Sequence, residues 1–188
     1  DIVPAPAERV REAADGSRWT LGRRELLVRD TPGHARHHFC LWDETSRGWF
    51  TGDTFGIGYR ELYCRGEPYL IPTTTPVQFE PGALLASIEL LMAAEPRYCY
   101  LTHFGRIAAS ARHAESLRRQ IRDYVRFAEG VDIGADGAQS ALTEALMTYT
   151  VDGLRAAGST LPVTTLRALL ALDMDLSAQG LVHWMRHR

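Results

Sequence analysis

The chain has 188 residues, of which 45% are hydrophobic, and this length predicts one domain or one and a half with a packed core. The formal net charge of −2 gives nothing to attract nucleic acid or an anionic membrane, so neither is expected as a partner, and no apolar stretch approaches the roughly 18 residues of a membrane span. The three cysteines are scattered without a CxxC pair, so the sequence predicts neither a disulfide framework nor a cysteine zinc site, and reduced cytoplasm is the expected compartment.

The first 51 residues predict short antiparallel strands after a helical start. A charged helix is predicted at about Ala7 to Ala14, because Pro4 and Pro6 precede it and the Asp15-Gly16 turn pair ends it. Runs of β-branched and aromatic residues separated by turn residues then predict four strands. These strands are expected at Arg18 to Leu21, Glu25 to Arg29, His38 to Trp42 and Trp49 to Thr51.

The rest of the chain predicts an irregular stretch followed mainly by helices. Residues from Gly52 to Thr75 are rich in glycine and proline, and an irregular stretch of that length inside a domain is usually functional. An apolar stripe predicts a helix from Pro81 to before Pro96, and Tyr98 to Leu101 has the composition of a buried strand. Further helices are expected at about 109–129, around 142–154, at 164–172 and at 177–185, with a linker at 130–137.

Three residues that could bind metal, two histidines and one aspartate, each follow a predicted strand or its end. His34 follows Thr31-Pro32-Gly33, Asp53 follows Phe50-Thr51-Gly52, and His103 follows Tyr100-Leu101-Thr102. Imidazole and carboxylate groups on short loops held by strands are what a hydrolytic metal site needs, because the strands set the spacing and the loops let the side chains converge. A glycine before His34 and another before Asp53 let the backbone turn sharply there.

These motifs, taken in order, resemble those of the metallo-β-lactamase superfamily. The segment 31–38 is similar to its third metal motif, 50–54 to the motif of its bridging aspartate, and 100–103 to its last histidine motif. The resemblance runs from about Pro6 to Gly105. It implies an α/β (α+β) fold, the αββα sandwich of two sheets. Residues 1–108 would form the second half of that domain, and 109–188 an extra C-terminal helical region.

The resemblance also implies a role for each motif residue. His34 would bind the first metal, Asp53 would bridge both metals and be the central catalytic residue, and His103 would bind the second metal. His38 would support a metal-binding residue without binding metal itself, or would be structural. Two zinc ions are the first expectation from mixed histidine and aspartate ligands, with iron or manganese as alternatives.

The sequence departs from the family in one respect, the absence of a His-x-His-x-Asp-His motif upstream of His34. In the family that motif supplies two ligands to each metal, so one private histidine per metal and the shared Asp53 remain here. Zinc sites normally use three or four protein ligands. The chain also begins with Asp1, and we expect the missing half, and the sheet that would cover this one, to belong to a longer natural protein.

The resemblance implies that the natural protein is a hydrolase of a small-molecule substrate. A metal-bound hydroxide would attack an ester, thioester, lactone or amide carbonyl. One alternative is a mononuclear iron oxygenase on the same fold, similar to persulfide dioxygenases. Another is that the chain is a catalytically incomplete fragment acting only by association. The C-terminal helices would either cap the mouth of the site or form a homodimer interface through Leu142, Tyr149 and Leu166.

Overall fold

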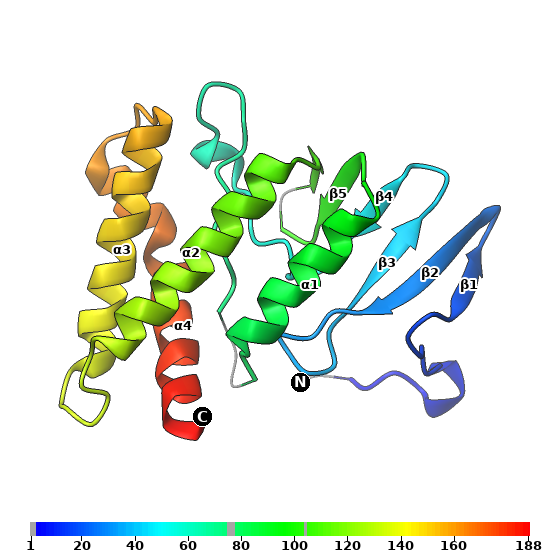
Figure 1. Cartoon of the computed structure of the whole chain (residues 1–188), viewed down its shortest axis with the longest axis horizontal. Helices are drawn as coiled ribbons and strands as arrows, with labels where there is room; N and C mark the ends of the chain where they lie inside the picture. Colours follow the sequence, from blue (N-terminus) through cyan, green and yellow to red (C-terminus); the bar gives the residue numbers. More distant parts are fainter. Residues whose placement is uncertain (1–2, 75–77, 104) are drawn as a thin grey trace.

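Six short strands form one sheet in which neighbours follow the order of the chain (Figure 1). The structure, a computed structural model, describes residues 3–74, 78–103 and 105–188. Strands β1 to β4 pair antiparallel, β4 pairs parallel with β5, and β5 pairs antiparallel with β6. The strands are β1 (Arg18–Leu21), β2 (Arg24–Asp30), β3 (Phe39–Asp43), β4 (Gly48–Phe50), β5 (Tyr98–Leu101) and β6 (Gly105–Ala108).

The direction of three strands decides where the site forms. β2 and β4 are both antiparallel to β3, and β5 is parallel to β4, so β2, β4 and β5 all run the same way. Their carboxyl ends therefore lie at one edge of the sheet. The parallel pair is possible because α1 (Pro81–Ala93) lies in the long connection between β4 and β5. Pro81 occupies the first turn of this helix, where its missing N–H costs nothing.

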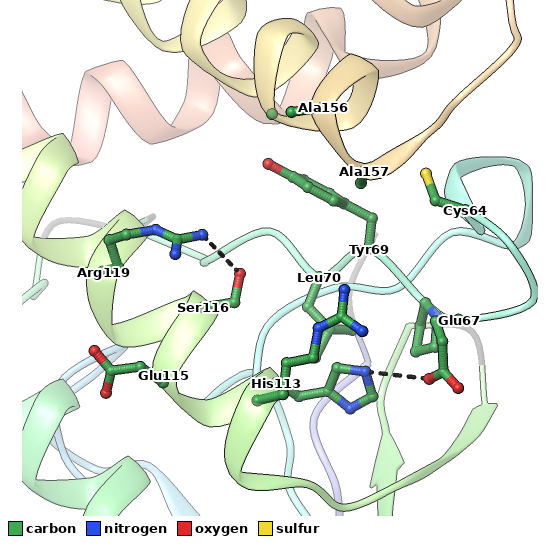
Figure 2. A pocket seen from close by; sticks show the side chains of 13 residues that line it. Cys64, Glu67, Tyr69, Leu70, His113, Glu115, Ser116, Arg119, Ala156 and Ala157 are labelled. Atoms are coloured by element: carbon green, nitrogen blue, oxygen red, sulfur yellow. Dashed lines mark hydrogen bonds and ion pairs between the residues drawn. The ribbon is translucent and has the colours of Figure 1, made fainter.

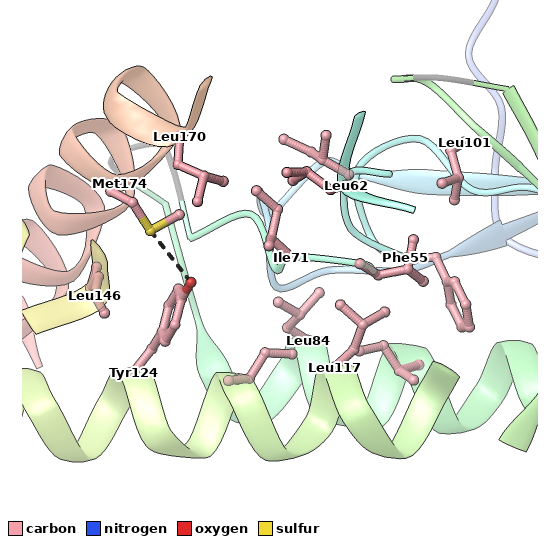
Figure 3. Close-up of a cluster of buried hydrophobic side chains, with 14 of the residues drawn as sticks. Phe55, Leu62, Ile71, Leu84, Leu101, Leu117, Tyr124, Leu146, Leu170 and Met174 are labelled. Atoms are coloured by element: carbon pink, nitrogen blue, oxygen red, sulfur yellow. Dashed lines mark hydrogen bonds between the residues drawn. The ribbon is translucent and has the colours of Figure 1, made fainter. Parts of the chain in front are cut away.

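Three other α-helices follow the sheet: α2 (Ala111–Glu129), α3 (Ala138–Ala157) and α4 (Val163–His187). α1 contacts α2, and α3 packs most extensively against α4 (Figure 1). One continuous apolar core joins the sheet to these helices, and Figure 3 follows it from Phe55 and Leu101 to Leu170. No helix in the described part of the chain is long and apolar enough to cross a membrane.

Most predicted elements are present, but two predictions were wrong and one strand was missed. The expected helix from Ala7 to Ala14 is only a 3-10 turn at Ala7–Arg9, because the segment is exposed and so short a helix needs packing to persist. β6 was not predicted. The two short helices predicted at 164–172 and 177–185 are one helix, α4, since neither glycine nor proline interrupts 173–176 and Met174 is buried in the core.

The irregular stretch predicted from Gly52 to Thr75 is confirmed as far as Thr74, and Thr75 lies outside the described residues. It contains a 3-10 turn at Arg60–Leu62 and a bridge between Ile57 and Ile71. Ile71 and Leu62 are completely buried, so this stretch is packed into the core despite having little regular structure.

The two faces of the sheet differ in their cover. Trp42, Trp49 and Cys99 point to the face that carries α1, and the Trp49 indole donates a hydrogen bond to the Leu91 carbonyl at 2.9 Å. On the other face, large apolar side chains remain in solvent. They include Trp19, Leu21, Phe39 and Phe50, with Phe39 46% and Phe50 43% exposed. We call these four residues the outer apolar face.

Candidate metal centre

His34, Asp53 and His103 meet at the sheet edge where β2, β4 and β5 end. The Nε2 atom of His34 lies 3.5 Å from Asp53 Oδ2, and the Nε2 atom of His103 lies 3.4 Å from Asp53 Oδ1. The carboxylate thus stands between two imidazoles, each facing a different oxygen. The structure therefore brings together all three residues that the sequence singled out, from loops up to 69 residues apart (103 minus 34).

The position of His34 depends on the loop before it. Gly33 has φ +133°, and a Cβ atom built there would lie 2.2 Å from the backbone nitrogen of Leu84 in α1. The loop therefore packs directly on the start of α1, and only glycine allows this approach. The Nδ1 atom of His34 is 3.4 Å from the Thr73 carbonyl oxygen. Because a carbonyl only accepts, Nδ1 is the donor in this contact, and Nε2 is the ring nitrogen that faces Asp53.

The position of Asp53 depends on His38. The backbone N–H of Asp53 donates to His38 Nε2 at 3.1 Å, while His38 Nδ1 lies 2.9 Å from Thr31 Oγ1 and 3.0 Å from Thr54 Oγ1. Burial lowers the pKa of His38, which keeps the ring neutral and Nε2 able to accept. Gly52, with φ +49°, lets this ring approach, since its Cβ would lie 2.3 Å from Nε2.

His38 therefore ties the end of β2 to the loop after β4. Its Nε2 is occupied by a backbone hydrogen bond, so it is placed to support Asp53 rather than to bind a metal itself. A second support comes from Thr73, whose hydroxyl donates to the Asp53 carbonyl oxygen at 2.8 Å. The sequence did not single out Thr73, because a threonine in an irregular stretch gives no signal of this contact.

The residues present fit a shared carboxylate between two cations. Asp53 Oδ1 is buried and has no hydrogen-bond partner within the described residues. A buried carboxylate oxygen without a donor is costly, and a cation would satisfy it. No group of three suitable side chains surrounds a single point within 3–74, 78–103 and 105–188. Each oxygen of Asp53 has one imidazole beside it, so each cation would need further ligands from elsewhere.

The three residues line a pocket of about 290 Å³ that α4 helps to close. Leu172, Asp173, Leu176 and Ser177 of α4 form one wall of it. All four lie in or directly beside the break at 173–176 that the sequence had wrongly suggested. Leu142 and Leu166, named above for a dimer interface, are instead buried within the core. The homodimer stays a prediction.

Asp173 was also missed from the sequence, whereas Tyr59 was expected in a loop on the substrate side of Asp53 and does line this pocket. The Tyr59 hydroxyl donates to Asp173 Oδ1 at 3.2 Å across the pocket wall. Burial and the neighbouring Asp173 carboxylate raise the pKa of Tyr59 to about 12, so its hydroxyl keeps its proton. Burial likewise raises the pKa of Asp173. The two residues are 114 positions apart, a separation that no local pattern reveals.

A second pocket, of about 440 Å³, lies between residues 64–70, α2 and α3 (Figure 2). His113 Nε2 faces Glu67 Oε2 there at 3.6 Å, and Arg119 is 3.5 Å from the Ser116 hydroxyl. It shares no lining residue with the pocket that contains His34, Asp53 and His103. Its larger size therefore does not make it part of the candidate metal centre.

The fold and the site define a mixed α/β protein that carries a histidine and aspartate cluster at the carboxyl ends of its strands. Residues 8–103 match the family profile of the metallo-beta-lactamase superfamily, which is more than half of the chain. The chain belongs to the metallo-beta-lactamase superfamily. The matched segment contains all three site residues, whereas α2, α3 and α4 lie beyond it.

The chain is similar to several solved structures. A metallo-beta-lactamase family protein from Thermus thermophilus is 19% identical over 93% of this chain and 48% of its own, with a TM-score of 0.56, which supports a shared fold. An archaeal metallo-beta-lactamase superfamily protein from Sulfolobus tokodaii is 26% identical over 79% of this chain and 53% of its own, with a TM-score of 0.48. A beta-lactamase domain protein from Burkholderia ambifaria is 15% identical over 98% of this chain and 48% of its own, with a TM-score of 0.45. The chain spans about half the length of these structures.

Proposed function

We propose that this chain supplies His34, Asp53 and His103 to a dinuclear metal centre in a hydrolase of small molecules. The observation that carries the proposal is the Asp53 carboxylate, which has an imidazole at each oxygen and a buried, unsatisfied Oδ1. A carboxylate between two imidazoles on opposite oxygens suits two cations, and this favours a dinuclear hydrolase over the single-iron oxygenase. Zinc is the first candidate, with iron or manganese as alternatives.

The residues have separate tasks in the proposed reaction. Divalent cations held by His34, Asp53 and His103 would supply Lewis acidity toward a carbonyl oxygen and would lower the pKa of water. His34 presents Nε2 because the Thr73 carbonyl holds its other nitrogen. Asp53 holds the two metal positions together, and His38 keeps the Asp53 backbone in place. The pocket wall from α4 limits access of water and orients an ester, thioester, lactone or amide substrate.

The remaining ligands are proposed to come from a second structural half that covers the outer apolar face. That face exposes Trp19, Leu21, Phe39 and Phe50, and large apolar side chains left in water favour a covering partner. In this proposal the 188 residues are inactive alone, because each metal position has too few ligands. The alternative is a catalytically incomplete fragment that acts only by association, and under that alternative no such second half exists.

The test is metal content and hydrolysis measured on the natural full-length protein. We expect about two equivalents of metal per chain by mass spectrometry, and turnover of generic ester or lactone substrates that a chelator abolishes and added zinc restores. His103→Ala should lose about one equivalent, whereas His183→Ala, which changes an imidazole outside the pocket, should lose none. Turnover that persists in chelator, or by the 188 residues alone, would contradict the proposal.

A further inference from the structure

Asp173 brings a second carboxylate into the pocket of the candidate metal centre. It lies on α4, beyond residues 8–103 that match the family profile, so the family motifs do not account for it. Its Oδ1 accepts a hydrogen bond from the Tyr59 hydroxyl at 3.2 Å. Its Oδ2 is buried and has no hydrogen-bond partner in the described part of the chain. One oxygen is therefore fixed by the protein, and the other remains able to accept.

The rest of the pocket is apolar at this end. Ile57, Pro72, Leu172 and Leu176 line it together with the two carboxylates, and none of its described lining residues is lysine or arginine. Leu172 is 68% exposed and Leu176 38% exposed, on the side of α4 opposite the buried Met174. Leucines that stay in solvent beside a pocket provide an apolar surface for a ligand.

We propose that Asp173, oriented by Tyr59, is a specificity-determining residue of this pocket, which takes a small acyl compound bearing an apolar body and a hydrogen-bond donor. The donor would be an ammonium, amide N–H or hydroxyl group that binds Asp173 Oδ2. The substrate class assigned here rests on the proposed function, because the acyl group is the part that the metal centre would act on.

Charge and size both define the substrate. A buried carboxylate oxygen without a donor raises the free energy of the empty pocket. A ligand with an N–H or O–H group removes that cost when it binds, so its affinity increases. A ligand with a carboxylate or phosphate at the same place would meet a like charge in a poorly screened pocket. The volume of about 290 Å³ is at the small end for ligand sites, which fits a small molecule.

The experiment measures binding without hydrolysis. The natural full-length protein, stripped of metal by chelator and labelled at isoleucine and leucine methyl groups, is titrated with hexylamine or hexanoate at pH 7 and followed by NMR. These two probes share an apolar chain and differ in the charge of the end group. We expect hexylamine to shift the methyl signals of Ile57, Leu172 and Leu176, and hexanoate to leave them unchanged.

The matched variants are Asp173→Asn and Asp175→Asn. Asp175 lies on the same helix but accepts hydrogen bonds from Gln139 and Gln179 outside the pocket. Asp173→Asn should weaken hexylamine binding about tenfold, as expected for a charge-assisted hydrogen bond, while Asp175→Asn should change it by less than about twofold. Equal binding of hexylamine by Asp173→Asn and the unsubstituted protein would overturn the inference. Equal binding of hexanoate at the same methyl groups would also overturn it, and that comparison needs no variant.

This result is separable from the proposed function. Selective binding through Asp173 in a protein that hydrolyses nothing would refute the hydrolase alone. Chelator-sensitive hydrolysis in a protein whose binding ignores Asp173 would refute the specificity role alone.

Discussion

At the scale of single residues, the site separates metal-binding candidates from the residue that supports them. Asp53 points its carboxylate between two imidazoles, whereas His38 points both ring nitrogens at the protein, one to the Asp53 backbone and one to threonine hydroxyls. The two residues touch, yet their chemistry differs. Loss of Asp53 removes a ligand, and loss of His38 loosens the loop that carries this ligand.

Asp53→Ala should therefore cost more metal and more activity than His38→Ala in the natural full-length protein. Supporting residues of this kind alter affinity or activity by about 10- to 100-fold, and a ligand shared by both metals should exceed that. The measurement is metal content with parallel kinetics for the two variants. If His38→Ala loses both metals while Asp53→Ala keeps metal and rate, the roles given to the two residues are reversed.

The glycine before His34 gives a second prediction. Gly33→Ala should lower the free energy of unfolding by about 2–4 kcal/mol, because the added Cβ meets the backbone of Leu84 and the φ of +133° is strained for alanine. Gly22→Ala is the control, since Gly22 has φ +62° but nothing within 4 Å, and it should cost only about 1 kcal/mol. Urea unfolding of the metal-free protein measures both. Equal costs would mean that the contact with α1 contributes nothing.

At the scale of elements, strand direction and one long helix assemble the pocket. β2, β4 and β5 point the same way and deliver His34, Asp53 and His103 to one edge. α4 then crosses the opening and supplies Asp173 and Leu176. α4 runs through 173–176 without a break because Met174 is completely buried on the side facing away from the pocket.

Asp43, a buried carboxylate in the β2–β3 pair, should make the free energy of unfolding depend on pH in acid. Burial raises the pKa of Asp43, but hydrogen bonds from Ser46 and Thr45 and the charge of Arg24 outweigh burial and hold it below 3.8. Because the pKa of Asp43 is lower in the folded state than in the unfolded state, the unfolded state binds more protons at pH values between the two. The stabilisation is therefore complete above pH 3.8 and is lost as pH falls through the folded pKa.

Asp43→Asn should accordingly destabilise the protein by about 1–3 kcal/mol at pH 7, and the difference from the unsubstituted protein should shrink below pH 3.8. Asp152→Asn, an exposed change on α3, should show no such dependence. Denaturant unfolding at a series of pH values measures both variants. A difference for Asp43→Asn that stays constant down to pH 2 would contradict this account.

At the scale of the whole molecule, the two faces of the sheet differ: α1 covers one, and the other buries Leu26 and Val28 but leaves the outer apolar face exposed. α1 covers Trp42 and Trp49, while the outer apolar face stays in contact with water. We predict that the 188 residues, when produced alone, self-associate through this face, because exposed apolar patches of this kind drive association. Sedimentation of Phe39→Gln/Phe50→Gln should show a smaller oligomer. Val163→Gln, which changes an exposed residue on α4, should not.

The sequence by itself determined the superfamily, the strands β1 to β5 and the three residues of the candidate metal centre. It could do so because each signal is local: a glycine before a ligand, a turn after a strand, an apolar stripe on a helix. Gly33 and Gly52 illustrate this, since both were expected from the motifs and both have the positive φ that a sharp turn requires.

Only the tertiary structure decided what surrounds those three residues. Thr73, Tyr59 and Asp173 reach the site through contacts across 20 to 114 positions, and such contacts depend on how α4 and the irregular stretch pack. The sequence pattern predicted two helices, at 164–172 and 177–185, with a break at 173–176. In the fold, Asp173 faces a pocket while its neighbour Met174 faces the core, so burial of Met174 keeps the helix continuous.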